Sequence, residues 1–147
     1  MVILSSPFEL PPGRLLALDL GQARHGVAVC DEAGILATPL TVLRRRATRA
    51  ADFADVLALV IREHAAGVLV GMPLDSAGTM GPQARWVRRY AGRLAAALPV
   101  PLAFWDESFS SSDAARLVAE SHGRTPLDAA AAAVVLQEFL EARRTRK

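Results

Sequence analysis

The sequence contains little cysteine, almost no lysine and no long apolar run. Cys30 is the single cysteine among 147 residues, which excludes an internal disulfide and a cysteine-based zinc site. No apolar stretch reaches the ~18 residues of a membrane-spanning helix, and the first 13 residues lack the charged start and apolar length of a signal peptide. We therefore expect a cytoplasmic protein with no membrane partner.

The length of the chain predicts one domain, because 147 residues can bury a sizeable core without a disulfide or a structural metal. Two prolines and a glycine close residues 1–13, which are expected to form a loose N-terminal extension. Residues 14–142 form the predicted domain, and residues 143–147 a basic tail.

The basic residues are nearly all arginine, and Lys147 is the single lysine, although the net charge is only +2. Genomic base composition alone could produce this bias. The alternative is phosphate binding, because the planar arginine fork matches phosphate oxygens in pairs. The arginines cluster at Arg44, Arg45, Arg46 and Arg49; at Arg85, Arg88, Arg89 and Arg93; and at Arg143, Arg144 and Arg146.

Hydrophobic periodicity predicts an α/β fold with the element order βββαβαβαα. Three strands joined by short turns, over 15–20, 25–30 and 35–43, predict an antiparallel meander. Buried strands over 68–71 and 100–105 then alternate with helices. The expected helices are one along 53–61 that Gly67 ends, one from Pro82 to Leu98, one over 110–123 and one over 125–142. This order predicts a five-stranded mixed sheet with parallel central strands, flanked by helices.

Two carboxylate positions follow apolar strands. Asp19 interrupts the run 15–20, where burial of a carboxylate is costly unless it has a partner or a metal ion. A solvated strand end, or a cap on the following glycine turn, would also explain it. Asp106 and Glu107 directly follow the strand over 100–105, and only one of these adjacent side chains is expected to face a ligand; chemistry alone does not decide which.

Asp128 allows two interpretations. It occupies the third position of a capping box opened by Thr125, where an acid satisfies a backbone donor. It also shares a helix face with Ala132, Val135 and Phe139, which would aim it at the end of the sheet. Acids without a histidine or cysteine cluster favour Mg²⁺ or Mn²⁺, and such a site suits phosphodiester hydrolysis.

The histidines and the cysteine are not expected to carry chemistry. The three histidines, His25, His64 and His122, are scattered along the chain, and His64 continues an apolar helix stripe, which favours a structural role. Cys30 lies within a strand and is interpreted as a small buried hydrophobic residue.

Four blocks of this sequence resemble the bacterial RuvX/YqgF family of the ribonuclease-H-like superfamily: LALDLGQARHGVAVCDEAG, VLVGMPLDSAGTMGPQA, FWDESFSS and LDAAAAAVVLQEFL. The family comprises Holliday-junction resolvase-like proteins and pre-16S rRNA nucleases. The resemblance covers residues 14–140 and implies a ribonuclease-H-like fold. It further implies a metal-dependent endonuclease whose catalytic and metal-binding acids are Asp19, Glu107 and Asp128, with Asp106 as an alternative ligand.

The same resemblance assigns the residues around the acids. It implies an active-site loop set of Gly21, Gly71, Pro73 and Gly78, and it places a basic turn residue at Arg24. We expect Arg24, Arg85, Arg88 and Arg89 to bind nucleic acid. The chain departs from the family at Ala23 and Ala129, where lysines are usual, and these losses remove positive charge near the site.

The expected function is 5′-end processing of pre-16S rRNA in ribosome biogenesis with Mg²⁺ or Mn²⁺. The alternative is resolution of Holliday junctions in branched DNA, which would require a symmetric dimer; sequence leaves monomer and homodimer open. An ATPase of the actin and sugar-kinase type is a remote alternative, since 147 residues cannot hold its two lobes. A nucleic-acid-binding module without catalysis is the fourth interpretation.

Overall fold

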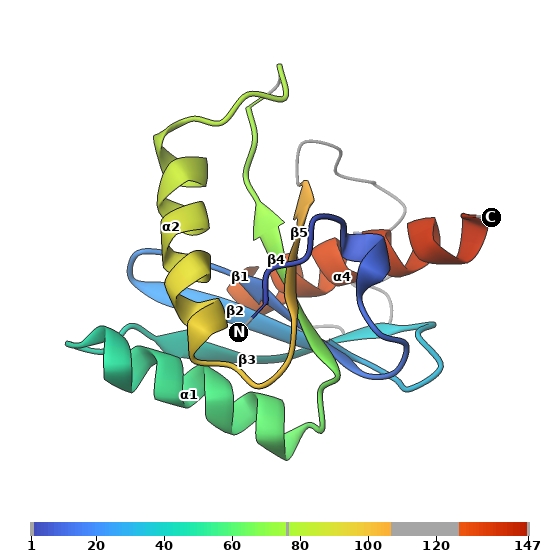
Figure 1. Cartoon of the computed structure of the whole chain (residues 1–147), viewed down its shortest axis with the longest axis horizontal. Helices are drawn as coiled ribbons and strands as arrows, with labels where there is room; N and C mark the ends of the chain where they lie inside the picture. The colour runs from blue at the N-terminus through green and yellow to red at the C-terminus, as the bar shows by residue number, and fades with distance from the viewer. Residues whose placement is uncertain (1, 76, 107–126, 147) are drawn as a thin grey trace.

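A computed structural model describes residues 2–75, 77–106 and 127–146. Its sheet has five strands in the order β3-β2-β1-β4-β5 (Figure 1). The strands are β1 (Leu15–Asp19), β2 (Arg24–Cys30), β3 (Ala37–Arg44), β4 (Gly67–Met72) and β5 (Leu102–Asp106). The helices are the short 3₁₀ helix η1 (Pro7–Glu9), α1 (Arg49–Arg62), α2 (Pro82–Ala96) and α4 (Leu127–Thr145).

The predicted mixed sheet is confirmed. Strands β1, β2 and β3 pair antiparallel as a meander, and Asp19 stands opposite Gly26 at the end of the β1–β2 pair. Strand β4 runs parallel to both β1 and β5. The carboxyl ends of β1, β4 and β5 therefore meet at one end of the sheet, where ligands of such folds bind.

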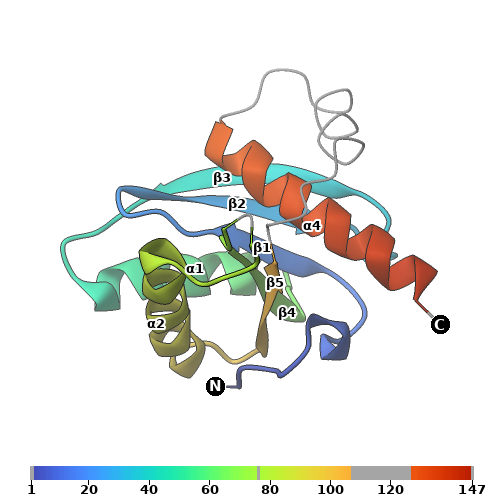
Figure 2. The ribbon, with the colours of Figure 1, turned by 90° about the horizontal axis from the view of Figure 1, so that it is seen from above.

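Helices cover both faces of the sheet, with α1 and α2 on one side and α4 on the other (Figures 1 and 2). Side chains alternate along each strand, so Leu16 and Leu18 pack in the core beneath α1 and α2. Leu15 and Ala17 pack in the second core, beneath α4. By the same alternation Asp19 points to the side of the sheet that carries α4.

The structure corrects the predicted end of the first helix. Helix α1 ends at Arg62 rather than at Gly67. His64, expected on an apolar helix stripe, instead lies beyond the helix in the left-handed region, with φ of 54°, and is exposed. It turns the chain toward β4, whose first residue is Gly67. The local apolar stripe favoured a longer helix, but the reversal into the parallel strand ended it earlier.

Strands β3 and β5 begin later than predicted, each for a local reason. The Asp31 carboxylate accepts hydrogen bonds from the amides of Ile35 and Leu36, at 2.7 and 3.2 Å, so these residues form a turn before β3. Pro101, which has no amide hydrogen, precedes β5. The third expected helix, over 110–123, lies outside the described residues.

The N-terminal extension is docked rather than loose. Ile3 bridges Leu102 of β5 in parallel orientation. Phe8 of η1 packs edge-on against Trp105, with ring centroids 6.1 Å apart, and the Arg146 guanidinium lies over the Phe8 ring. The basic tail begins within α4, which continues to Thr145. None of the described helices has the length and hydropathy of a membrane span.

Candidate active site

The structure brings Asp19 and Asp128 together, although 108 residues separate them in sequence. Asp19 ends β1 opposite Gly26, and Asp128 lies in the first turn of α4. A Cβ atom at Gly26 would overlap the backbone carbonyl of Asp128, so only glycine lets α4 begin this close to the strand. The close approach at Gly26 therefore places the start of α4 beside the end of β1.

Burial, and after it the nearby charge of Asp128, together raise the pKa of Asp19 to about 6. The negative charge of Asp128 thus opposes ionisation of the Asp19 carboxyl group. A divalent cation between them would relieve this repulsion, and carboxylate oxygens are the ligands that Mg²⁺ and Mn²⁺ prefer.

Arg24 lies at the same site. Its Nε atom stands 2.8 Å from the Asp128 carboxylate, and both side chains are open to solvent, with 60% and 40% of their surface exposed. The turn between Asp19 and Arg24 is tight, since a Cβ atom at Gly21 would overlap the carbonyl oxygen of Arg24. The turn thus brings one arginine, 60% exposed, next to the acids, where its guanidinium can meet a phosphate.

Asp106 does not share the face of Asp19. It is exposed at the end of β5, and with Met72 and Phe104 it lines a cavity of about 700 Å³. Phe104 belongs to the core beneath α1 and α2, on the opposite side of the sheet from α4. Glu107, the other member of the predicted acidic pair, lies outside the described residues.

The predicted loop residues lie at the same end of the sheet. Gly71 belongs to β4, and Pro73 begins the segment that leads to α2. Within it the Asp75 carboxylate accepts hydrogen bonds from the amides of Ala77 and Thr79, and Gly78 has a φ of 76°. This turn fixes the path of the chain between β4 and α2.

The arginines of α2 do not join Asp19 and Asp128, although Arg88 lines the same cavity as Asp106. Arg85, Arg88 and Arg89 are exposed, but their helix packs on the face opposite α4 (Figure 2). Arg85 donates to the carbonyl of Met80 at 3.1 Å, which ties it to the loop before α2. Among the predicted nucleic-acid ligands, the structure therefore places Arg24 at the acidic pair and the other three on a separate surface.

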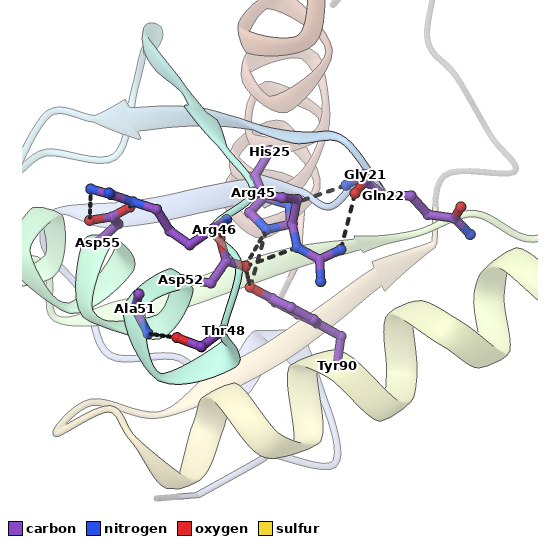
Figure 3. A network of polar contacts seen from close by, with 10 residues as sticks. All are labelled: Gly21, Gln22, His25, Arg45, Arg46, Thr48, Ala51, Asp52, Asp55 and Tyr90. Atoms are coloured by element: carbon purple, nitrogen blue, oxygen red, sulfur yellow. Dashed lines mark hydrogen bonds and ion pairs between the residues drawn. The ribbon is translucent and has the colours of Figure 1, made fainter.

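Sequence reasoning missed a buried polar network under the turn. His25 is completely buried, and its ring meets Asp52 of α1 and Tyr90 of α2, while Arg45 approaches from the end of β3 (Figure 3). The available signal was a histidine in an otherwise apolar strand. Its partners lie 27 and 65 residues away, so no local spacing could reveal them.

Within residues 2–75, 77–106 and 127–146, no three histidine, cysteine or acidic side chains gather closely enough to hold a metal ion. Asp19 and Asp128 supply two carboxylates on one side of the sheet, and their mutual repulsion suits a cation. The donor set that the structure describes is therefore compatible with a hard divalent ion and requires at least one further ligand.

Residues 13–142 match the family described as "RuvX: Holliday junction resolvase". The chain belongs to the RuvX family. Among its curated relatives named "Putative pre-16S rRNA nuclease", the protein from Anaeromyxobacter dehalogenans is 42% identical over 135 residues, covering 88% of this chain and 98% of the relative. The protein of the same name from Roseiflexus sp. is 34% identical over 138 residues, covering 90% and 97%.

Solved structures support the fold of this RuvX-family chain. RuvC from Thermus thermophilus, solved in complex with a Holliday junction substrate, superposes with a TM-score of 0.62 and covers 90% of this chain and 96% of RuvC. The two sequences are 17% identical, so the likeness establishes the shared ribonuclease-H-like fold alone. The predicted fold class and family are both confirmed.

Proposed function

We propose that this protein is a divalent-metal-dependent endonuclease that hydrolyses phosphodiester bonds of pre-16S rRNA during maturation of its 5′ end. The observation that carries the proposal is the convergence of Asp19 and Asp128 at the carboxyl end of β1, with the pKa of Asp19 raised to about 6. A carboxyl group with a raised pKa, beside a second acid and an exposed arginine, is typical of a site for phosphate chemistry. The names of the curated relatives support the RNA substrate.

Each residue has a distinct role in this proposal. Asp19 and Asp128 hold Mg²⁺ or Mn²⁺, and we assign Glu107 as a third ligand from the sequence. The bound ion supplies an activated water and stabilises charge on the phosphate. Arg24 neutralises Asp128 before substrate binds, and its exposed guanidinium can then pair with a phosphate oxygen. The arginines of α2 bind the nucleic acid away from the acids.

A second candidate substrate is branched DNA, because the family that matches residues 13–142 is described as a Holliday junction resolvase. The small net charge of +2 favours RNA, since a four-way junction presents a broad phosphate surface and favours a strongly basic face. A ribosomal precursor can be held in part by other assembly factors.

The two substrates can be compared directly. Purified protein with equal Mn²⁺ would be incubated with a labelled pre-16S rRNA fragment or with a four-way DNA junction, and the Asp19→Asn variant would serve as the inactive control. We expect cleavage of the RNA by the wild type alone. Symmetric paired nicking of the junction without RNA cleavage would reverse this ranking, and equal cleavage by the variant would remove Asp19 from the mechanism.

A further inference from the structure

We propose that His25 is a positioning residue for the nuclease: its neutral ring holds the turn of residues 21–24 in the shape that presents Arg24 to Asp128. The effect of His25 on catalysis rests on the proposed nuclease function. The contacts that carry it belong to the described structure. They link α1 and α2, on one face of the sheet, to the acids on the other face.

The hydrogen bonds of the ring assign its tautomer. The amide of Gly21 donates to Nδ1 of His25 at 3.2 Å, so Nδ1 must be an unprotonated acceptor. The opposite nitrogen, Nε2, lies 3.0 Å from the Asp52 carboxylate and 3.1 Å from the Tyr90 hydroxyl. Nε2 therefore carries the hydrogen and donates it toward Asp52, which can only accept.

Burial keeps the ring of His25 neutral against the pull of the Asp52 charge. Burial lowers the pKa of His25 and outweighs the opposing effect of the hydrogen bond that the ring donates to Asp52. Burial alone would raise the pKa of Asp52, but hydrogen bonds from Tyr90 and His25 lower it overall, so this carboxylate is ionised. Three groups therefore face His25. Asp52 of α1 is ionised, the Tyr90 hydroxyl of α2 stays protonated because its pKa is raised, and Arg45 is a cation.

Arg45 extends the same network to the rest of the turn. Its Nε lies 3.2 Å from the Asp52 carboxylate as an ion pair, and its guanidinium stands 5.2 Å from the centre of the Tyr90 ring. Its NH1 group donates to the carbonyl of Gln22 at 3.2 Å, and its backbone amide donates to Ala23 at 3.0 Å. Three successive residues of the turn, Gly21, Gln22 and Ala23, are therefore anchored to His25 and Arg45. Figure 3 shows the contacts of the first two.

His25 and Gly26, neighbours on β2, face opposite sides of the sheet. His25 points toward α1 and α2, whereas Gly26 receives the start of α4 with Asp128. The turn anchored by His25 connects Asp19 to Arg24, and Arg24 pairs with Asp128. An apolar residue could fill the space of His25, but it could not accept the hydrogen bond that the Gly21 amide donates. A change at His25 thus alters the acidic site through the turn.

Two substitutions separate positioning from simple core packing. In His25→Asn the side-chain oxygen can take the place of Nδ1 and still accept from Gly21. In His25→Gln the amide nitrogen can take the place of Nε2 and donate to Asp52, but the acceptor for Gly21 is lost. Each variant loses one ring contact, so their unfolding temperatures should be similar. His64→Asn is the control and should behave as wild type, because His64 lies outside this network and its left-handed backbone conformation suits asparagine.

We expect kcat for RNA cleavage to fall about tenfold in His25→Gln, equivalent to about 1.4 kcal/mol of barrier, and to stay within about threefold in His25→Asn. Hydrogen exchange at the Gly21 amide should accelerate in His25→Gln only. Imidazole ¹⁵N shifts of the wild type should show a hydrogen on Nε2 and none on Nδ1.

A hydrogen on Nδ1, unchanged Gly21 exchange in His25→Gln, or equal loss of kcat in both variants at equal stability would each overturn the proposal. The exchange and ¹⁵N measurements require no substrate. A wild-type protein that cleaves no RNA or DNA therefore contradicts the proposed function, while these two measurements still decide whether His25 holds the turn.

Discussion

Replacement of Asp19 by asparagine should stabilise the metal-free protein while abolishing cleavage. Burial and then the charge of Asp128 raise the pKa of Asp19 from 3.8 to about 6. The folded state therefore binds this proton more tightly than the unfolded chain, and the free energy of unfolding falls as pH rises through this window. Above pH 6 the loss of unfolding free energy caused by ionised Asp19 is complete, and below pH 3.8 it is absent.

The size of the effect follows from the pKa. A rise from 3.8 to about 6 is equivalent to about 3 kcal/mol. Asp19 is not fully buried, so solvent screening reduces the expected gain of the Asp19→Asn variant to about 1–2 kcal/mol at pH 8. For a chain of this length that gain corresponds to an increase of roughly 3–8 °C in Tm.

Thermal unfolding in EDTA at pH 8 and at pH 4 tests this reasoning. The variant should unfold at a higher temperature at pH 8, and the difference should shrink at pH 4. Added Mn²⁺ should raise the Tm of the wild type more than that of the variant, because ligand binding stabilises only a site that can hold the ion. Asp31→Asn is the control of opposite sign, since amide hydrogen bonds, chiefly from Ile35, lower the pKa of Asp31.

A lower Tm of Asp19→Asn at pH 8 in EDTA would refute the argument, because it would show that the folded state favours the ionised Asp19. Normal cleavage by the variant would show independently that Asp19 holds no catalytic ion.

Three further substitutions test other parts of the site. Arg24→Ala should change Tm little, because an exposed ion pair contributes at most about 1 kcal/mol. It should nevertheless weaken RNA binding and reduce the slope of log affinity against log salt by about one. An unchanged slope would exclude a phosphate contact of Arg24. Gly26→Ala should cost about 1–3 kcal/mol in denaturant unfolding and reduce cleavage, because its Cβ overlaps the Asp128 carbonyl, and full activity would contradict the close approach. Gln137→Leu removes the acceptor of a 2.9 Å hydrogen bond from the Ala37 amide. It should lower the free energy of unfolding by about 1–3 kcal/mol in the same assay and leave kcat of the folded protein unchanged. A selective loss of kcat would instead link β3 to catalysis.

Much of the fold could be predicted because its signals are local. The apolar run that ends at Asp19 and the change from a period of two to a period of 3.6 give the strands, the helices and their order. The left-handed turn at His64 could not be predicted, because its only cause is the need to reverse the chain into β4. The local apolar stripe indicated a continuing helix.

The site was less predictable, because its geometry depends on pairs that are distant in sequence. Asp19 was conspicuous as a charge in an apolar strand, but its meeting with Asp128 depends on the space that Gly26 leaves for α4. The network of His25 joins three elements through side chains alone. The exposed arginines of α2 illustrate the opposite case, since their clustering in sequence did not bring them to Asp19 and Asp128.

The two outer strands of the described sheet have consequences for self-association. Residues 2–4 occupy the free side of β5, where Leu102 donates to Val2 at 2.9 Å and accepts from Leu4 at 2.8 Å. The opposite outer strand, β3, carries Pro39, which offers no amide hydrogen, at the point where its pairing with β2 shifts register. Unpaired edge backbone is what recruits strands from other molecules into fibrils or shared sheets. Removal of the first five residues would therefore leave the backbone of β5 without these partners and should promote strand pairing between copies of the protein.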